Sequence, residues 1–415
     1  MTRDFKGSSW YIEFKGKETL MEKFTYHAPT EIVFGKGAET RAAEFVTKYG
    51  GTRAVLIYGG QSAVKSGLIA RLEEGLRAGG IEVLSLGGVV PNPLVSTARE
   101  MARKAIEFKA DFVLAAGGGS VIDTAKGVAH AAGDPSHDIW EYWTGTPIVK
   151  SLPVGAVLTI SAAGSETSDS AVLTNDTITP PIKKGVNTVF NRCRFALMNP
   201  ELTMSLPKYQ IGAGAADIFM HTSERYFSPV LGNHLSDEIA EGLFRDIIHY
   251  GPIGVKHPDN YEAMSEIMWC GSISHVGITG LGGLGDWACH QLGMAMSAIY
   301  DSTHGATLTA VWPSWCRYVM GENVARFANF ARKVYGIHEG DDDLAAEKGI
   351  DKTVDFFRSL GMPVSLEELL GHAVTDEEIE HMADVCSWGN TRTIGSFRKL
   401  DREDMAEIYR MSRTV

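Results

Sequence analysis

The stretch DFVLAAGGGSVIDTAKG, residues 111–127, decides the fold. It begins with a run of apolar, strand-forming residues, continues through three glycines, and then shows apolar residues at helical spacing. Free backbone N–H groups and the positive end of a helix dipole attract a phosphate where a strand turns into a helix. We therefore expect the turn Gly117-Gly118-Gly119-Ser120 to hold a phosphate group, with a plain tight turn as the alternative. Asp123 follows, where it could cap the helix or face the ligand.

Strand and helix patterns alternate on both sides of this stretch. Apolar runs at 52–60 and 81–89 end in glycines and predict strands, whereas 65–80 and 96–110 have helical spacing. Such alternation indicates a mostly parallel sheet with crossover helices, and after about residue 197 nearly all patterns are helical. We expect a Rossmann-like α/β nucleotide-binding domain followed by an all-α domain. The expected division is an N-terminal extension at 1–24, the α/β domain at 25–196 and the helical domain at 197–415.

Composition excludes several classes of protein. The 415 residues are 44% hydrophobic and 22% charged, which is typical of a globular chain. Lys and Arg number 39 against 51 Asp and Glu, and the net charge of −12 argues against a nucleic-acid partner. Five scattered cysteines without a CxxC argue against a disulfide scaffold or a zinc ribbon. The chain has neither an apolar signal core nor a membrane-length apolar run, so we expect a cytoplasmic protein with no membrane partner.

Two further glycine-rich segments have different readings. Gly60-Gln61-Ser62 follows the strand pattern at 52–60, where dinucleotide enzymes meet the adenosine ribose. No acidic residue stands there to repel a 2′-phosphate, which weakly favours NADP over NAD, while a bare turn stays the alternative. The stretch 280–285 matches GxGxxG, but it follows a helical pattern rather than a strand, so we interpret it as a loop between helices.

Four residues of the helical half could share a metal ion. Asp217 and His221 are four residues apart on a predicted helix, so both project from one face. His290 and His304 could reach the same ion only if the chain breaks at 301–303 and folds back. One carboxylate and three imidazoles suit Fe²⁺ or Zn²⁺. Histidines packed in the core, or lying on the surface, are the alternative reading.

Taken together, these motifs resemble the iron-containing (group III) alcohol dehydrogenases, especially the butanol dehydrogenase branch. The resemblance extends in family order over nearly the whole chain after Thr25. The matching segments include FGKGAE (34–39), PNP (91–93), GGGSVIDTAKG (117–127), ALMNPELTMSLP (196–207), DIFMHTSERYF (217–227), GDWACHQLG (285–293), YDSTHGATLTAVWP (300–313) and IGSFRKL (394–400).

The resemblance implies a dehydroquinate synthase-like architecture and assigns roles to individual residues of this chain. It implies that Asp217, His221, His290 and His304 bind the metal and that Gly118, Gly119 and Ser120 bind the pyrophosphate. It implies further cofactor contacts near Asp123, Thr159 and Lys183, and places Gly60, Gln61 and Ser62 beside the adenine ribose. A homodimer is a further expectation from the family.

Two positions depart from the family pattern. Met294 stands where relatives often have a histidine that could relay protons, and Ala295 follows where an acidic residue is common. Methionine cannot move protons. In AAGSE (162–166), which corresponds to the family motif TxGSE, Ala162 stands where the family has a hydroxyl residue near the nicotinamide. We expect these changes to affect substrate choice and proton delivery, not metal or cofactor binding.

The expected activity is metal-dependent, NAD(P)-linked hydride transfer between a primary alcohol and its aldehyde. The alternatives are a metal-dependent lyase of the dehydroquinate synthase type, a metal hydrolase without redox chemistry, and a cofactor-binding relative without catalysis. Trp140 and Trp143 could line the substrate cleft or belong to the core.

Overall fold

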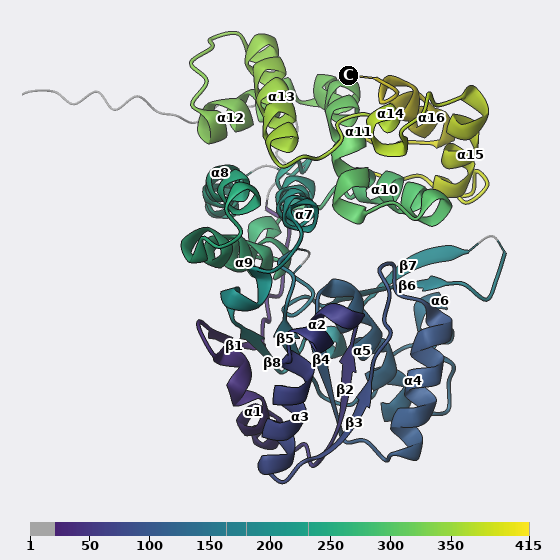
Figure 1. The fold of residues 1–415 in the computed structure, drawn as a ribbon. Coiled ribbons are helices and arrows are strands. Elements are labelled where there is room, and N and C mark those ends of the chain that lie inside the picture. The colour runs from purple at the N-terminus through teal and green to yellow at the C-terminus, as the bar shows by residue number, and fades with distance from the viewer. Residues whose placement is uncertain (1–20, 163, 180, 231, 415) are drawn as a thin grey trace, which may run out of the picture.

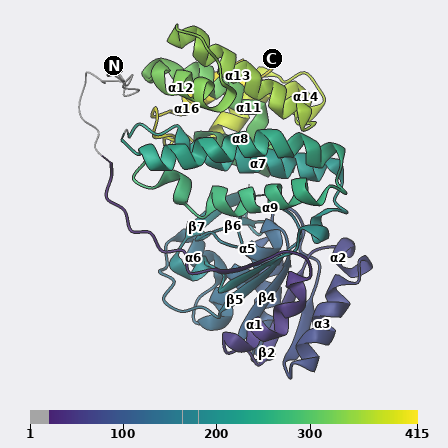
Figure 2. The same ribbon diagram turned by 90° about the vertical axis from the view of Figure 1, so that its left-hand side faces the viewer.

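The computed structural model describes residues 21–414 except 163, 180 and 231. The chain forms an α/β half and, above it in Figure 1, a helical half that begins with α7. Residues 21–30 adopt no regular structure, and in Figure 2 they run as an extended trace toward the sheet. The predicted extension at 1–24 therefore lies mostly outside the described residues.

The α/β half is built on a parallel sheet of six strands. Their order is β1-β8-β5-β4-β2-β3, and every neighbouring pair is parallel. The central strand β4 is buried along its whole length, as expected when helices cover both faces of a sheet. The strands are β1 (Glu31–Phe34), β2 (Arg53–Tyr58), β3 (Glu82–Leu86), β4 (Phe112–Gly117), β5 (Val154–Leu158) and β8 (Phe195–Met198).

Helices cover both faces of this sheet. Figure 1 shows α4 and α5 on one side and α1 and α3 on the other, and each side has its own apolar cluster. This arrangement confirms the Rossmann-like α/β prediction. The helices of this half are η1 (Ala38–Arg41), α1 (Ala42–Lys48), α2 (Gln61–Lys65), α3 (Leu68–Ala78), α4 (Val95–Glu107), α5 (Gly119–Gly133), α6 (Ile139–Thr144), η2 (Val189–Asn191) and η3 (Pro200–Thr203).

An antiparallel hairpin was not expected from the sequence. Strands β6 (Ser170–Asn175) and β7 (Ile182–Asn187) pair outside the main sheet. In Figure 1 the hairpin projects from the α/β half beneath α10. It therefore stands where the two halves meet, and it carries Lys183.

The helical half packs around a single large core. Phe219 on α7 touches the rings of Phe244, Trp312 and Phe330, which come from three other helices. The helices are α7 (Lys208–Tyr226), α8 (His234–Lys256), α9 (Tyr261–His275), η4 (Ile278–Gly280), α10 (Ala288–Tyr300), α11 (His304–Val319), η5 (Met320–Glu322), α12 (Val324–Tyr335), α13 (Asp342–Ser359), α14 (Leu366–Leu370), α15 (Asp376–Cys386) and α16 (Arg402–Met411).

The cysteines and the hydropathy of the helices complete the description. All five cysteines are buried and free, so no disulfide framework exists. Among the described helices, none combines the length and the apolar character that crossing a membrane requires.

Candidate active site

One face of α7 carries a row of ionisable side chains. Asp217, His221 and Glu224 follow one another at intervals of four and three residues, so they lie on the same side of the helix. All three are at least 95% buried. Burying polar groups is costly unless each finds a partner. Such a row therefore indicates a ligand or a second set of polar groups facing it.

The second set of groups comes from α10 and α11. Helix α10 ends at Tyr300, and Asp301 takes a left-handed conformation with φ of 50°. The chain then reverses, and α11 begins at His304. This break brings His304 back toward His290, and their ring centroids are 5.4 Å apart. The prediction that residues 301–303 interrupt the helix is confirmed.

The four predicted ligands come together around Asp217. Its Oδ1 lies 3.5 Å from Nε2 of His221, 4.0 Å from Nε2 of His290 and 3.9 Å from Nε2 of His304. Two ligand atoms bound at about 2.1 Å to one tetrahedral ion are separated by roughly 3.4 Å. Asp217, His290 and His304 offer atoms that all lie within 4.8 Å of one another, and His221 stands beside this group.

The chemistry of these donors fits a divalent cation. Oδ1 of Asp217, Nε2 of His290 and Nδ1 of His304 are buried without any hydrogen-bond partner. Burial raises the pKa of Asp217 to about 6 and lowers the pKa values of His221 and His304 well below the usual range. Neutral imidazoles and an orphaned carboxylate oxygen are the ligands that Fe²⁺ or Zn²⁺ accepts.

Two residues that contact the predicted histidine ligands from behind were not predicted from the sequence. Oε1 of Glu224 accepts a hydrogen bond from Nδ1 of His290 at 3.0 Å, which directs Nε2 of that ring toward Asp217. Nδ1 of His275, the last residue of α9, lies 3.0 Å from Nδ1 of His221. Glu224 could have been found from its helical spacing to Asp217. For His275 no sequence signal exists, because only packing brings α9 against α7.

The triple-glycine turn lies where the sequence placed it. Helix α5 starts at Gly119, directly after β4, and no side chain caps its first turn. A Cβ on Gly118 would approach the side chain of Ile160 to 2.9 Å, whereas one on Gly119 would meet no atom within 4 Å. The backbone at Gly119 thus faces open space, as a cradle for an anion requires. Ser120 follows in the same turn.

The loop after β5 connects this turn to the metal-ligand helix. The N–H of Thr159 donates to the carbonyl of Gly117 at 3.1 Å. Further along, a Cβ on Gly214 of α7 would come within 2.1 Å of the carbonyl oxygen of Ser161. Backbone contact at Gly214, less than one turn before Asp217, sets the glycine turn and the ligand cluster side by side.

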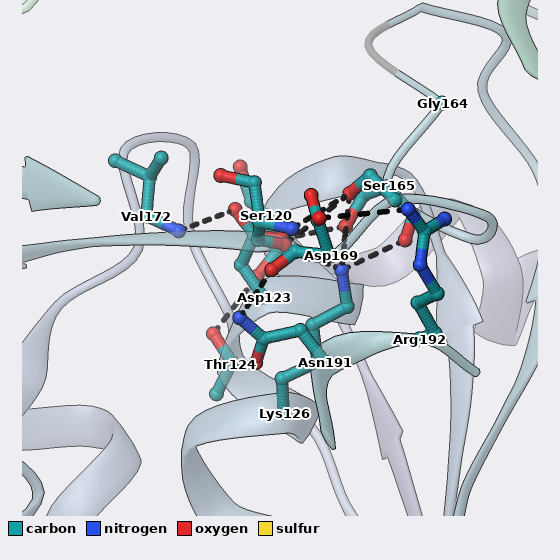
Figure 3. Close-up of polar contacts among 12 residues, drawn as sticks. Ser120, Asp123, Thr124, Lys126, Gly164, Ser165, Asp169, Val172, Asn191 and Arg192 are labelled. Atoms are coloured by element: carbon teal, nitrogen blue, oxygen red, sulfur yellow. Dashed lines mark hydrogen bonds and ion pairs between the residues drawn. The ribbon is translucent and has the colours of Figure 1, made fainter. Parts of the chain in front are cut away.

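Asp123 acts within a polar network rather than as a helix cap (Figure 3). Its Oδ1 accepts a hydrogen bond from Oγ of Ser165 at 2.6 Å, and its Oδ2 accepts one from the N–H of Val172 at 2.9 Å. Nζ of Lys126, fully buried, donates to the carbonyls of Ser165 and Ser170 at 2.8 and 2.6 Å. Together they fasten the 165–172 segment to α5, next to the expected cofactor position.

Lys183 lies between the two groups of predicted site residues. Nζ donates to Oδ1 of Asn92 at 2.8 Å, and Nδ2 of Asn92 donates to Oδ1 of Asp301 at 2.8 Å. This chain joins the hairpin, the loop before α4 and the turn before His304. Burial lowers the pKa of Lys183 to about 8, although the negative charges of Asp123, Asp217 and Asp301 act to raise it.

The second glycine turn also opens a helix. Gly60 precedes α2 in an extended conformation, and no side chain caps that helix. Ser62 and Lys65 are exposed there, and of Gln61 only the helical backbone is described. The turn therefore offers a cation and a hydroxyl without an acidic residue, as the sequence indicated.

Several smaller expectations can also be compared with the structure. Trp143 is 2% exposed and belongs to the core, and Trp140 is partly buried against the same apolar cluster. Residues 281–287 connect η4 to α10, which confirms the loop reading of GxGxxG. Met294 lies on α10 one turn after His290. Ala162 lies in the loop between β5 and β6, and Ala163 after it lies outside the described residues.

Family models cover nearly the whole chain. The model described as iron-containing alcohol dehydrogenase matches residues 29–200, and that of the Fe-containing alcohol dehydrogenase family, C-terminal, matches 212–413. NADH-dependent butanol dehydrogenase A of Clostridium acetobutylicum is 36% identical over 395 residues, which is 94% of this chain and 100% of the relative. NADPH-dependent aldehyde reductase YqhD of Escherichia coli is 35% identical over 84% of this chain and 89% of the relative.

A solved structure agrees with these relatives. That of NADH-dependent butanol dehydrogenase A from Thermotoga maritima superposes with a TM-score of 0.90 at 35% identity. The match covers 96% of this chain and 100% of that chain. The similarity therefore includes both halves and the junction between them.

Proposed function

Because the chain belongs to the iron-containing alcohol dehydrogenase family, we propose that it interconverts a primary alcohol and its aldehyde with a nicotinamide nucleotide and a divalent cation. The single observation that carries the proposal is the cluster of Asp217, His290 and His304, whose ligand atoms lie within 4.8 Å of one another and each of which has a buried polar atom without a hydrogen-bond partner. In a purely structural core, buried polar atoms of this kind are normally hydrogen-bonded. Family membership favours this activity over the lyase and hydrolase alternatives.

We assign the cation to Asp217, His221, His290 and His304, with Fe²⁺ preferred over Zn²⁺ because of the family. When bound, the cation would supply Lewis acidity at a substrate oxygen, and the nicotinamide would supply the redox chemistry. The protein's own part is orientation. Glu224 turns His290 toward the cluster, and Asp217, His221 and His290 are each at least 94% buried.

The nucleotide is assigned to the carboxyl edge of the sheet. Gly118, Gly119 and Ser120 would bind the pyrophosphate with the free N–H groups of α5, since that helix has no side-chain cap. Thr159 and Lys183 would contact the nicotinamide half, because both lie between the glycine turn and Asp217. Asp123 would act there mainly by holding the 165–172 segment in place.

We propose a preference for NADPH over NADH. Gly60, Gln61 and Ser62 form the turn expected beside the adenine ribose, and Lys65 follows on the same short helix. The absence of a carboxylate in that turn removes the repulsion of a 2′-phosphate. Comparing kcat/KM for the two nucleotides tests this point, and a higher value with NADH would contradict it.

We also propose a homodimer, in which a second copy could pair with the sheet edge. Strand β1 is the outermost strand on its side, and Phe34 on it is 41% exposed. Sedimentation of the full chain tests the assembly, and a monomer at micromolar concentration would refute it.

The experiment for the activity is aldehyde reduction by the purified chain. With Fe²⁺ added, we expect NADPH oxidation that depends on butanal, and we expect it to disappear after chelation and in Asp217→Asn. Lack of turnover across a panel of aldehydes, despite stoichiometric binding of metal and NADPH, would instead support a binding protein without catalysis.

A further inference from the structure

His275 stands directly behind one of the proposed metal ligands. It ends α9, and its ring lies 4.1 Å from the ring of His221, centroid to centroid. The two Nδ1 atoms lie 3.0 Å apart. A hydrogen bond between two imidazole nitrogens needs a proton on one of them and a lone pair on the other. The direction of this bond decides which nitrogen of His221 can bind a cation.

Arg225 settles the direction of that bond. Its Nη2 lies 3.4 Å from Nδ1 of His275, and a guanidinium can only donate. Arg225 is held in this place by two further contacts, since Nη1 donates to the carbonyl of His221 at 2.7 Å and the guanidinium lies 4.7 Å above the ring of Trp287. Nδ1 of His275 is therefore an acceptor, and its ring proton is on Nε2.

The proton of His221 follows from this arrangement. Because Nδ1 of His275 accepts, Nδ1 of His221 must donate to it, which leaves the lone pair of His221 on Nε2. Nε2 is the atom that lies 3.5 Å from Oδ1 of Asp217. In the opposite tautomer Nε2 would donate to Asp217, and two ligands would satisfy each other instead of a cation.

We propose that His275 is a positioning residue that holds His221 with its proton on Nδ1, so that Nε2 is free to bind the cation. The inference rests on the metal site proposed above. Glu224 performs the corresponding task for His290 with a carboxylate. His275 performs it with a neutral ring, and thus adds no second negative charge beside the site.

A matched pair of substitutions tests the hydrogen bond rather than the shape of the side chain. In His275→Asn, Oδ1 stands as far from Cβ as Nδ1 does in histidine and can accept the same bond. In His275→Leu a methyl group occupies that place and accepts nothing. His249→Leu, at an exposed position of α8, controls for the loss of a histidine as such.

The readout is the affinity of the metal-free full-length chain for Co²⁺, measured by competition with a chromophoric chelator. The visible absorption of bound Co²⁺ reports its coordination. We expect His275→Leu to weaken binding about 10- to 100-fold, the usual cost of losing an outer partner of a metal ligand. His275→Asn should recover most of that loss, and His249→Leu should bind as the wild type does.

A second variant keeps the test decisive if His275→Leu folds poorly. Arg225→Met removes the donor that makes Nδ1 of His275 an acceptor, so His221 can change tautomer, and Co²⁺ binding should weaken here too. Equal affinities of the wild type and His275→Leu, or equal losses in the Leu and Asn variants, would overturn the inference. Failure of the wild type to bind one Co²⁺ per chain would instead overturn the metal site itself.

Discussion

Gly119→Ala should separate cofactor binding from folding. The added Cβ would meet no protein atom within 4 Å, and the φ angle of Gly119 is not in the left-handed region. The substitution therefore introduces no strain, and alanine at the start of α5 loses less conformational entropy on folding than glycine does. We expect the free energy of unfolding to stay constant or to rise by up to about 1 kcal/mol.

Binding of the nucleotide should change in the opposite direction. The space in front of Gly119 is the space that we assign to the pyrophosphate, and a methyl group there would collide with it. Overpacking costs about 1–3 kcal/mol, which corresponds to a loss of NADPH affinity of about 5- to 150-fold. The gain in stability and the loss in affinity would thus come from the same methyl group.

Fluorescence titration with NADPH and urea denaturation of the same preparations measure the two quantities. Gly75→Ala is the matched control, because Gly75 is an exposed helical glycine of α3 whose Cβ would also meet no atom within 4 Å. The control should gain stability without losing affinity. An unchanged NADPH affinity in Gly119→Ala would refute the placement of the pyrophosphate at this turn.

Three further predictions concern other parts of the chain. Asp217→Asn removes the only carboxylate of the ligand set. The iron content and the affinity for iron, determined by mass spectrometry, should fall about 100-fold or more. Retention of iron would contradict the assignment. Lys126→Met leaves the carbonyl oxygens of Ser165 and Ser170 without their donor. Urea denaturation should therefore show that the free energy of unfolding falls by about 3 kcal/mol. A loss below about 1 kcal/mol would argue against the network in Figure 3. Burial lowers the pKa of His130 to about 4. The unfolded chain therefore takes up this proton first as the pH falls from about 6.5 to 4, and wild-type stability should decline across that window more steeply than that of His130→Gln; parallel curves would exclude this cause.

Local patterns were sufficient to predict both halves of the fold and the break before His304. In β4 a run of buried apolar residues leads into glycines, and α7 carries Asp217 and His221 on one face, so neighbouring residues contain the information. The hairpin of β6 and β7 was missed, because the alternation of apolar and polar residues in it is weak. The six residues of β7 are IKKGVN, a mixture of lysines, apolar residues, an asparagine and a glycine. Pairing with β6, rather than periodicity, makes β7 a strand.

By itself, the amino-acid sequence determined the pattern of apolar and polar residues along each helix and strand. That pattern was sufficient to predict the layered α/β half, the helical half and the four candidate ligands. The tertiary structure alone decided that His275 faces His221, that Lys183 reaches Asn92, and that Asp301 joins them to the turn before His304. The reason is physical. Periodicity reports which face of an element is buried, whereas a hydrogen bond between residues 54 or 91 positions apart depends on how whole elements pack.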